Sequence, residues 1–310
     1  MADQPTDRSH LSTEQVNPAS AALHEMSVDE CVRLINTEDA RITQAVARAE
    51  AQIAALITAA ERGFASSGRL IYLGAGTSGR LGVLDASEAP PTFHVEPGRV
   101  IGIIAGGDSA LRTSSESAED DPDGARGELS QLNLTDEDTL IGIAAGGTTP
   151  YVRGAFEIAM RFAPGITTGM ITCSNVKAPP SCAHLVFLDT GPEVIAGSTR
   201  MKAGTATKLV LNTISTTLMV RTGRVYQNLM VDLRPTNDKL RDRAARVVSR
   251  LTGLEREESL RQLDNAGNNV KAAVVMHTRC VDLDTATLLL ANAQGRLGDV
   301  LQGHASRDLG

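Results

Sequence analysis

The stretch 74–79, which reads GAGTSG, follows a short apolar run and combines three glycines with two hydroxyl residues. Its pattern G-x-G-x-x-G would by itself suggest a dinucleotide site. Such a site needs an acidic residue about 20 residues further on, but the second predicted strand runs on to Gly106-Gly107-Asp108. Hydroxyls at a helix N-terminus instead suit a terminal phosphate. We predict phosphate contacts from Gly76, Thr77, Ser78 and Gly79; the alternative is a tight turn with capping hydroxyls.

Two other segments place similar donors where helices are expected to begin. Thr148 and Thr149 follow a Gly-Gly pair at the end of the third predicted strand, and Pro150 suits a first helical turn. The segment 197–202, GSTRMK, opens a long apolar helix. Cations in a first turn oppose the helix dipole, so a bound anion would relieve them. We predict that an anion is bound by Ser198, Thr199, Arg200 and Lys202; the alternative is an ordinary N-cap with solvated cations.

Three glutamates are candidates for acid–base chemistry. Glu88 precedes Ala-Pro-Pro, Glu119 lies in the acidic run 116–121, and Glu193 lies in Gly-Pro-Glu. Two carboxyls that face a bound sugar phosphate could act as base and acid, although an acidic run is more often a solvated surface. We expect no metal site, because the six histidines form no H-x-x-x-H or Cys/His cluster. There is also no G-x-S-x-G nucleophile elbow.

The elements that would position these residues are short apolar runs separated by helical or loop segments. The runs begin near positions 69, 100, 139, 169 and 185 and show no polar alternation. This pattern predicts an α/β fold with a doubly wound parallel sheet of about five strands. Ligands bind such sheets outside the carboxyl ends of the strands, which is where the glycines fall.

The chain is expected to have three parts. Residues 1–20 are polar and predicted to be mobile, residues 21–235 form the main α/β domain, and residues 236–310 form a small helical domain without strands. The helix that follows the glycine-rich stretch is expected to break at Pro90-Pro91, because proline lacks a backbone N–H.

Composition limits the classes of partner. The net charge of −7 argues against a nucleic-acid surface, which would need a basic face. The N-terminus has no apolar run typical of a signal peptide, and Lys208 and Asn212 interrupt the apolar stretch 203–220, so no membrane span is expected. The four cysteines form no C-x-x-C pair, as in a protein with reduced thiols. We therefore predict a cytoplasmic protein.

Five blocks of sequence resemble the N-acetylmuramic acid 6-phosphate etherase family, and together they span almost the whole chain. The longest is GRLIYLGAGTSGRLGVLDASEAPPTF at 68–93. The resemblance implies a sugar isomerase (SIS) domain that binds sugar phosphates, a helical C-terminal region and a homodimer. The remaining blocks are TEQVNPAS (13–20), SAEDD (117–121), GPEVIAGSTRMKAGTATKLVLN (191–212) and NLMVDLRPTNDKL (228–240).

The resemblance also implies a reaction. Family members cleave the lactyl ether of N-acetylmuramic acid 6-phosphate by elimination and hydration, giving N-acetylglucosamine 6-phosphate and D-lactate in the recycling of cell-wall sugars. The reaction needs a base and an acid but no metal or redox cofactor. By motif match, Glu88 corresponds to the acid that protonates the departing lactate, and Glu119 corresponds to the second catalytic carboxylate. Which of the two is acid and which is base stays open.

The chain departs from the family pattern at two places. The family usually has Glu-Gly-Ala-Glu where this chain has ESAE at 116–119, and Ser-Gly-Arg-Thr-Pro where it has GGTTP at 146–150. The second change removes a hydroxyl and a cation near the predicted phosphate pocket. Two other functions on the same fold are a non-catalytic sugar-phosphate sensor, like the glucokinase regulatory protein, and an aldose–ketose isomerase. Retention of Glu88 and Glu119 favours the lyase.

Overall fold

The computed structural model describes residues 7–113 and 116–303, which divide into two compact units. One, the sheet unit, comprises the chain up to Ser87 together with Gly98–Ser215. The other, the helical unit, comprises Glu88–Pro97 together with the chain from Thr216 onward. The predicted boundary between residues 235 and 236 therefore falls within the helical unit. Of the predicted mobile segment, residues 1–6 lie outside the described residues.

The sheet unit is built on a parallel five-stranded sheet with the order β2-β1-β3-β4-β5. The predicted doubly wound α/β fold is thus confirmed. The strand order reverses between β1 and β3, because β2 lies on one side of β1 and the later strands lie on the other. Such a switch point is where open α/β sheets bind ligands. The strands are β1 (Leu70–Gly74), β2 (Val100–Ile104), β3 (Thr139–Ile143), β4 (Thr167–Thr172) and β5 (His184–Phe187).

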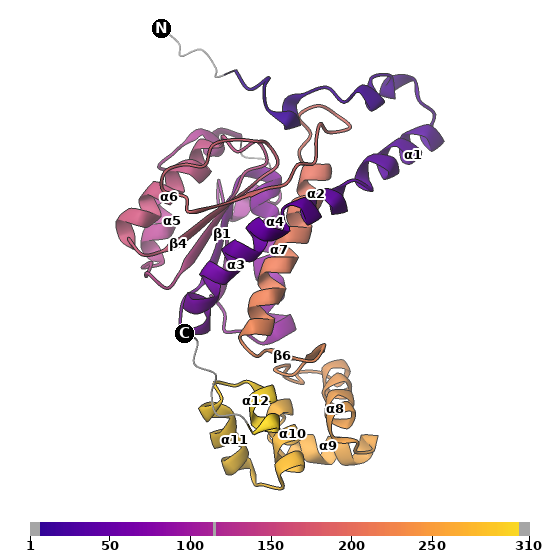
Figure 1. Cartoon of the computed structure of the whole chain (residues 1–310), viewed down its shortest axis with the longest axis vertical. Coiled ribbons are helices and arrows are strands. Elements are labelled where there is room, and N and C mark those ends of the chain that lie inside the picture. Colours follow the sequence, from indigo (N-terminus) through magenta and orange to yellow (C-terminus); the bar gives the residue numbers. More distant parts are fainter. Residues whose placement is uncertain (1–6, 114–115, 304–310) are drawn as a thin grey trace. The chain divides into compact units, whose positions relative to one another are not determined.

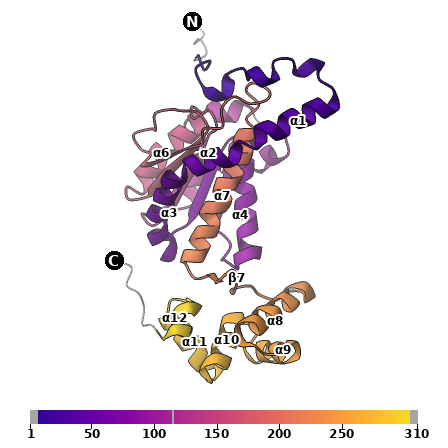
Figure 2. The ribbon, with the colours of Figure 1, turned by 45° about the vertical axis from the view of Figure 1, so that its right-hand side comes forward.

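Helices cover both faces of this sheet (Figures 1 and 2). Tyr72 of β1 points toward one face, where Gly82 of α4 lies against it, whereas Ile71 and Leu73 point into the core on the other. The apolar residues of both faces therefore have helical partners, which explains why the strands show no polar alternation. The first face carries α3 (Glu50–Ala65), α4 (Gly76–Phe93) and α7 (Lys202–Arg221), and the second carries α5 (Arg126–Gln131) and α6 (Pro150–Phe162); α1 (Val28–Asp39) and α2 (Ile42–Arg48) precede α3.

α4 continues through Pro90 and Pro91 to Phe93, so the predicted break is wrong. Each proline removes one i→i−4 hydrogen bond from the last turns of the helix, and the backbone nevertheless keeps its helical path for two further residues. The N–H of His94 donates to the carbonyl oxygen of Pro90 at 2.9 Å and closes the final turn.

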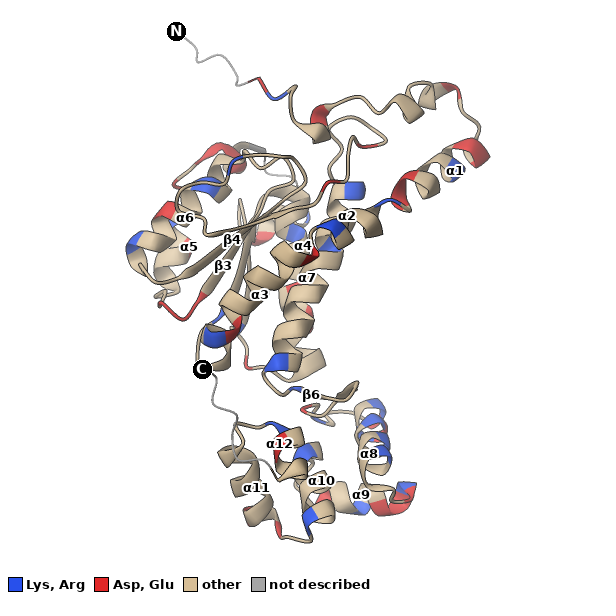
Figure 3. Cartoon of the chain, in the orientation of Figure 1, with Lys and Arg blue, Asp and Glu red and all other residues tan. Residues whose placement is uncertain are grey.

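The helical unit has its own apolar core. A short antiparallel pair, β6 (Val225–Tyr226) and β7 (Leu229–Met230), precedes the helices. Val248 of α8, Leu263 of α9 and Val274 of α10 are buried in this core. Several Lys and Arg residues lie on α8 (Figure 3). The helices are α8 (Asp238–Thr252), α9 (Arg256–Asn265), α10 (Val270–Arg279), α11 (Leu283–Asn292) and α12 (Leu297–Gln302).

Candidate active site

A cavity of about 190 Å³ lies in the sheet unit at the carboxyl ends of β1 and β3. We call it the strand-end cavity. It occupies the point where the strand order reverses, as expected for a ligand site in this topology. The structure brings together at its wall the following predicted residues: Gly76, Thr77, Ser78, Glu119, Thr148, Thr149 and Thr199.

β1 and α4 approach each other so closely at the glycine-rich stretch that two positions admit no side chain. A Cβ atom on Gly74 would lie 2.8 Å from the nitrogen of Gly79, and one on Gly79 would lie 2.6 Å from the oxygen of Gly74. The chain therefore passes directly from strand to helix, with Thr77 and Ser78 in the first turn. The N–H groups of this turn have no partner within the helix and carry its positive dipole end. Gly79 contributes packing and does not line the cavity.

The loop after β3 supplies the opposite wall. Thr149 is the N-cap residue of α6, with Pro150 as the first helical residue, but its side chain makes no capping hydrogen bond. Its hydroxyl is therefore available to a ligand in the cavity. Thr148 and Gly146 line the cavity beside it.

The N-terminal strap, which we define as residues 8–17, forms a third wall that the sequence analysis missed. Arg8, Leu11 and Glu14 all line the strand-end cavity. Glu14 lies close to the loop before α7, since a Cβ atom on Gly197 would lie 3.1 Å from its Oε2 atom. The strap thus adds one cation and one carboxylate to a site otherwise lined mainly by hydroxyls and backbone.

Specific hydrogen bonds hold the strap on the sheet unit. The hydroxyl of Ser12 donates to the carbonyl oxygen of Cys173, just beyond β4, at 3.0 Å. The Thr13 side chain is fully buried and its hydroxyl lies 3.3 Å from that of Ser174. The N–H of Gly197 donates to the carbonyl oxygen of Thr13 at 2.9 Å. The strap therefore connects the end of β4 to the loop that carries Thr199.

The two predicted catalytic carboxylates have different positions. Glu119 lies on the 3-10 helix η5 (Glu116–Asp120) and lines the strand-end cavity. Glu88 lies on α4, ten residues after Ser78, and does not line the cavity. At a rise of 1.5 Å per residue, that separation is about 15 Å along the helix axis.

Glu193, a predicted acid–base candidate, and Lys202, predicted to contact a bound anion, are buried and bind groups of the protein instead. The Glu193 carboxylate accepts hydrogen bonds from the N–H groups of Lys202 and Ala203, each at 2.9 Å, and so caps α7. The Nζ atom of Lys202 donates to Glu38 Oε2 at 2.6 Å. Asn17, at the end of the strap, donates to the same carboxylate oxygen at 2.8 Å. Glu193 and Lys202 therefore position the start of α7.

Burial and hydrogen bonding have opposite effects on the pKa values of the Glu193 and Glu38 carboxyls. Burial raises the pKa of Glu193, and the two backbone N–H groups oppose that rise. Burial also acts to raise the pKa of Glu38, but the hydrogen bonds from Lys202 and Asn17 outweigh it and lower the pKa below its ordinary value. The ion pair of Glu38 and Lys202 is therefore favoured in the folded protein.

Two further predicted residues lie at the edge of the site. Ser198 is half-buried and Arg200 is exposed, and neither lines the strand-end cavity. Within residues 7–113 and 116–303, no group of three or more His, Cys, Asp and Glu side chains could hold a metal ion. In the same residues, no helix is long and apolar enough to cross a membrane.

Comparisons with known proteins point to one family. The family model described as the glucokinase regulatory protein N-terminal SIS domain matches residues 49–160. The N-acetylmuramic acid 6-phosphate etherase of Crocosphaera subtropica is 48% identical over 297 residues, covering 96% of this chain and 97% of that protein. The protein of the same name from Gloeobacter violaceus is 47% identical and covers 99% of this chain and 100% of its own length.

Solved structures are more distant. A protein of E. coli CFT073 in complex with A5P is 17% identical, with a TM-score of 0.47, and covers 66% of this chain and 97% of that one. The phosphoheptose isomerase of Neisseria gonorrhoeae is 16% identical, with a TM-score of 0.42, and covers 62% and 98% respectively.

Proposed function

Because the chain belongs to the N-acetylmuramic acid 6-phosphate etherase family, we propose that it cleaves the D-lactyl ether of N-acetylmuramic acid 6-phosphate. The products are N-acetylglucosamine 6-phosphate and D-lactate, and the role is in amino-sugar recycling. The main support is near-full-length identity of 46–48% to curated etherases. A cavity that combines a helix N-terminus, threonine and serine hydroxyls and a carboxylate suits a sugar phosphate.

The proposed reaction uses the acidity of the C2 proton beside the aldehyde of the open-chain sugar. A carboxylate, assigned here to Glu119, accepts that proton; the electron pair forms the C2–C3 double bond, and the C3–oxygen bond to lactate breaks. A second carboxyl, assigned to Glu88 by motif match, gives its proton to the departing oxygen. Water then adds to C3 of the unsaturated aldehyde. General acid–base catalysis of this kind contributes roughly 10²–10⁴-fold per group.

The deciding experiment is release of D-lactate from N-acetylmuramic acid 6-phosphate, measured with a D-lactate dehydrogenase assay. We expect the wild-type protein to release stoichiometric D-lactate, and Glu119→Gln to lose at least about 10²-fold in kcat while retaining substrate binding. Asp120→Asn is the matched control, because Asp120 is an exposed carboxylate next in the same 3-10 helix. Substrate binding without lactate release from the wild type would contradict the lyase function.

That negative outcome would favour the second candidate, a sugar-phosphate-binding regulatory protein. Its specific support is the match of residues 49–160 to the SIS domain of a glucokinase regulatory protein. A regulatory protein would bind the sugar phosphate with the same cavity and leave the ether intact. The lactate assay and a binding measurement on one sample therefore separate the two functions.

A homodimer and a cytoplasmic location are also part of the proposal. Leu84 of α4 and Leu209 of α7 are 40% and 37% exposed. The two helices lie side by side (Figures 1 and 2), joined by the hydrogen bond from the Ser215 hydroxyl to Asp85. Exposed leucines on adjacent helices suit a contact between copies. Sedimentation velocity tests the homodimer, and a monomer at every concentration would contradict it.

The cytoplasmic location is supported by the cysteines. Cys31, Cys173, Cys182 and Cys280 are free thiols, which suit a reducing compartment.

A further inference from the structure

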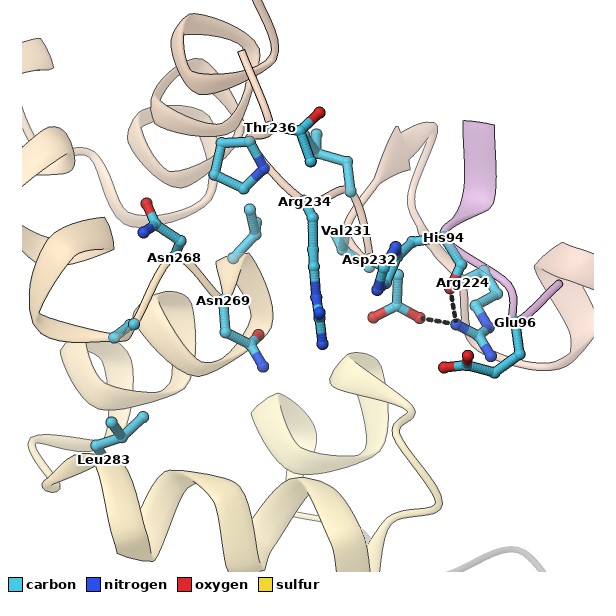
Figure 4. Close-up of a pocket in the computed structure, with 15 residues that line it drawn as sticks. His94, Glu96, Arg224, Val231, Asp232, Arg234, Thr236, Asn268, Asn269 and Leu283 are labelled. Carbon is cyan, nitrogen blue, oxygen red and sulfur yellow. Dashed lines mark hydrogen bonds and ion pairs between the residues drawn. The ribbon is translucent and has the colours of Figure 1, made fainter. Parts of the chain in front are cut away.

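A second cavity, of about 760 Å³, lies entirely within the helical unit. No step of the proposed reaction uses it. Its walls come mainly from two loops: Val231–Thr236, between β7 and α8, and Ala266–Val270, between α9 and α10 (Figure 4). His94, Glu96, Arg224 and Leu283 complete the wall. We call it the Arg234 cavity.

Arg234 occupies the middle of this cavity. Its side chain extends from the first loop into the space between the two loops (Figure 4). Within the described part of the chain, its guanidinium has no hydrogen-bond or ion-pair partner. A guanidinium carries five N–H donors in a planar array that matches the oxygens of a carboxylate or a phosphate. The side chain therefore offers a recognition group that the protein itself does not use.

Asn269 adds a second donor with a fixed orientation. Its Oδ1 atom accepts a hydrogen bond from the N–H of Ala272 at 3.0 Å, which caps α10. Since the oxygen is used in this way, the Nδ2 group is the part left for the cavity, and the side chain points toward the end of Arg234 (Figure 4). The first turn of α10 begins directly after it, so two N–H groups and the positive dipole end lie beside this donor.

The acidic residues of the wall do not cancel this preference for an anion. Asp232 lies between two cations, at 3.4 Å from Arg224 Nη1 and 2.7 Å from Lys271 Nζ. Arg224 also donates to the carbonyl oxygen of His94 at 3.0 Å and is thereby held in place. Glu96 is the second carboxylate of the wall. Counting Lys271, which pairs with Asp232 from outside the wall, three cations stand against two carboxylates, and Arg234 is the one of these cations that has no ion-pair partner among the described residues.

We propose that the Arg234 cavity binds a small oxyanion, a phosphate monoester or a carboxylate, between the Arg234 guanidinium and the Asn269 amide. The bound anion joins the loop before α8 to the loop before α10. This site is separate from the strand-end cavity, and its existence does not depend on the lyase reaction.

The test is an NMR titration of the full-length, ¹⁵N-labelled protein at constant ionic strength. Inorganic phosphate and D-lactate are added in separate experiments, and the backbone amides of Asn269 and Val270 and the Nε–H of Arg234 are followed. We expect saturable shifts at these positions with at least one probe. Saturation by phosphate alone assigns a phosphate monoester, saturation by lactate alone assigns a carboxylate, and saturation by both assigns the wider oxyanion class.

Two variants test the named contacts. Arg234→Gln removes the guanidinium from an exposed loop position, and we expect an affinity at least about tenfold lower, as for a lost charged hydrogen bond. Asn269→Asp keeps a good N-cap residue but replaces the donor with a negative charge, so it should also abolish the saturable shifts.

Arg250→Gln is the matched control, because Arg250 is an exposed arginine of α8 outside the cavity. It changes the net charge equally and should leave the affinity unchanged. Ser78→Ala, in the other cavity, should not alter the shifts of Asn269 and Val270. Shifts that fail to saturate, or that are the same in the wild type and in Arg234→Gln, would overturn the proposal.

Discussion

Hydroxyl groups supply most of the polar side chains that face the strand-end cavity. Thr77 and Ser78 come from the first turn of α4, Thr148 and Thr149 from the loop after β3, and Thr199 from the loop before α7. Each is short, so its hydroxyl is fixed by the backbone at low entropic cost. A phosphate held in this way is oriented by neutral donors and helix dipoles, with Arg8 as the cation of the wall.

Removing one of these hydroxyls should weaken binding without affecting the chemical step. We expect Ser78→Ala to raise KM for the sugar phosphate by roughly ten- to a hundredfold with little change in kcat, because a hydrogen bond to a charged group contributes about 1.5–3 kcal/mol. Steady-state kinetics of lactate release measure this. The control is Ser109→Ala, which changes an exposed serine beyond β2 that does not line the cavity. An unchanged KM for Ser78→Ala would argue against the phosphate cradle.

Glu88 needs a separate test, since it lies about 15 Å along α4 from Ser78 and does not line the cavity. If it protonates the departing lactate, Glu88→Gln should lower kcat by about 10² or more and leave equilibrium binding of the sugar phosphate intact. Single-turnover kinetics with binding by calorimetry separate the two effects. Ser87→Ala is a neighbouring control on the exposed side of the same helix. Equal turnover in wild type and Glu88→Gln would remove Glu88 from the mechanism.

At the scale of the elements, the sheet was predictable and the N-terminal strap was not. Buried parallel strands such as β1 and β3 are continuous apolar runs, a local signal that sequence reveals directly. The strap has no such signal, because its position depends on hydrogen bonds from Ser12 and Thr13 to residues about 160 positions later in the chain. The TEQVNPAS block at 13–20, which overlaps the strap, is part of the family resemblance, and that is the indication the sequence offers for this segment.

The predicted role of Lys202 differs from the structure for the same reason, because a partner of its side chain lies far away in the sequence. A lysine in the first turn of α7 opposes the helix dipole, so the sequence alone predicts a bound anion that compensates it. The structure supplies the carboxylates of Glu38 and Glu193 instead, and Glu38 is 164 positions away in the sequence. Local electrostatics indicated that an anion would relieve the start of α7, and only the tertiary structure could show carboxylates of the protein in that place.

The strap leads to a prediction about the cation that the family pattern places in the loop after β3. This chain has Thr148 in that loop, and Arg8 lines the same cavity. We expect Arg8→Gln to raise KM about tenfold, a loss at the weaker end for a charged hydrogen bond because the residue is exposed. Arg33→Gln, an exposed arginine of α1, is the control. If Arg8 replaces the cation that the family has at position 148, adding Thr148→Arg to the Arg8→Gln variant should restore the wild-type KM. An unchanged KM after either substitution would refute this.

At the scale of the whole molecule, each of the two units has apolar core residues of its own among the described residues. The core between the sheet and α6 belongs to the sheet unit, and the core of α8 to α12 belongs to the helical unit. The division falls inside α4 and α7, between Ser87 and Glu88 and between Ser215 and Thr216. Sequence signals mark the ends of helices, so a boundary within a helix could not be predicted from them.

A buried ion pair of the sheet unit should make stability dependent on acid. Asp138, 1% exposed, accepts hydrogen bonds from the Arg69 backbone N–H at 2.7 Å and from Arg69 Nη2 at 2.6 Å. Burial acts to raise the pKa of Asp138, but Arg69 and the Thr135 N–H outweigh it and lower the pKa. A lowered folded-state pKa gives stability that is complete above the unfolded-state pKa of about 3.9 and is lost as pH falls through the folded value.

Asp138→Asn should therefore destabilise the sheet unit at neutral pH and flatten its loss of stability in acid. Removing one partner of a buried pair lowers the free energy of unfolding by roughly 3–5 kcal/mol. Because Arg69 is partly exposed, we expect a loss near the lower figure. Hydrogen exchange measures this by segment, and we expect faster exchange in β1 and β3 than in the wild type, with α8 and α10 little changed. Asp242→Asn, which breaks the exposed pairs to Arg246 and Arg256 in the helical unit, is the control and should have no measurable effect. Equal acceleration in both units would show that the two cores unfold together.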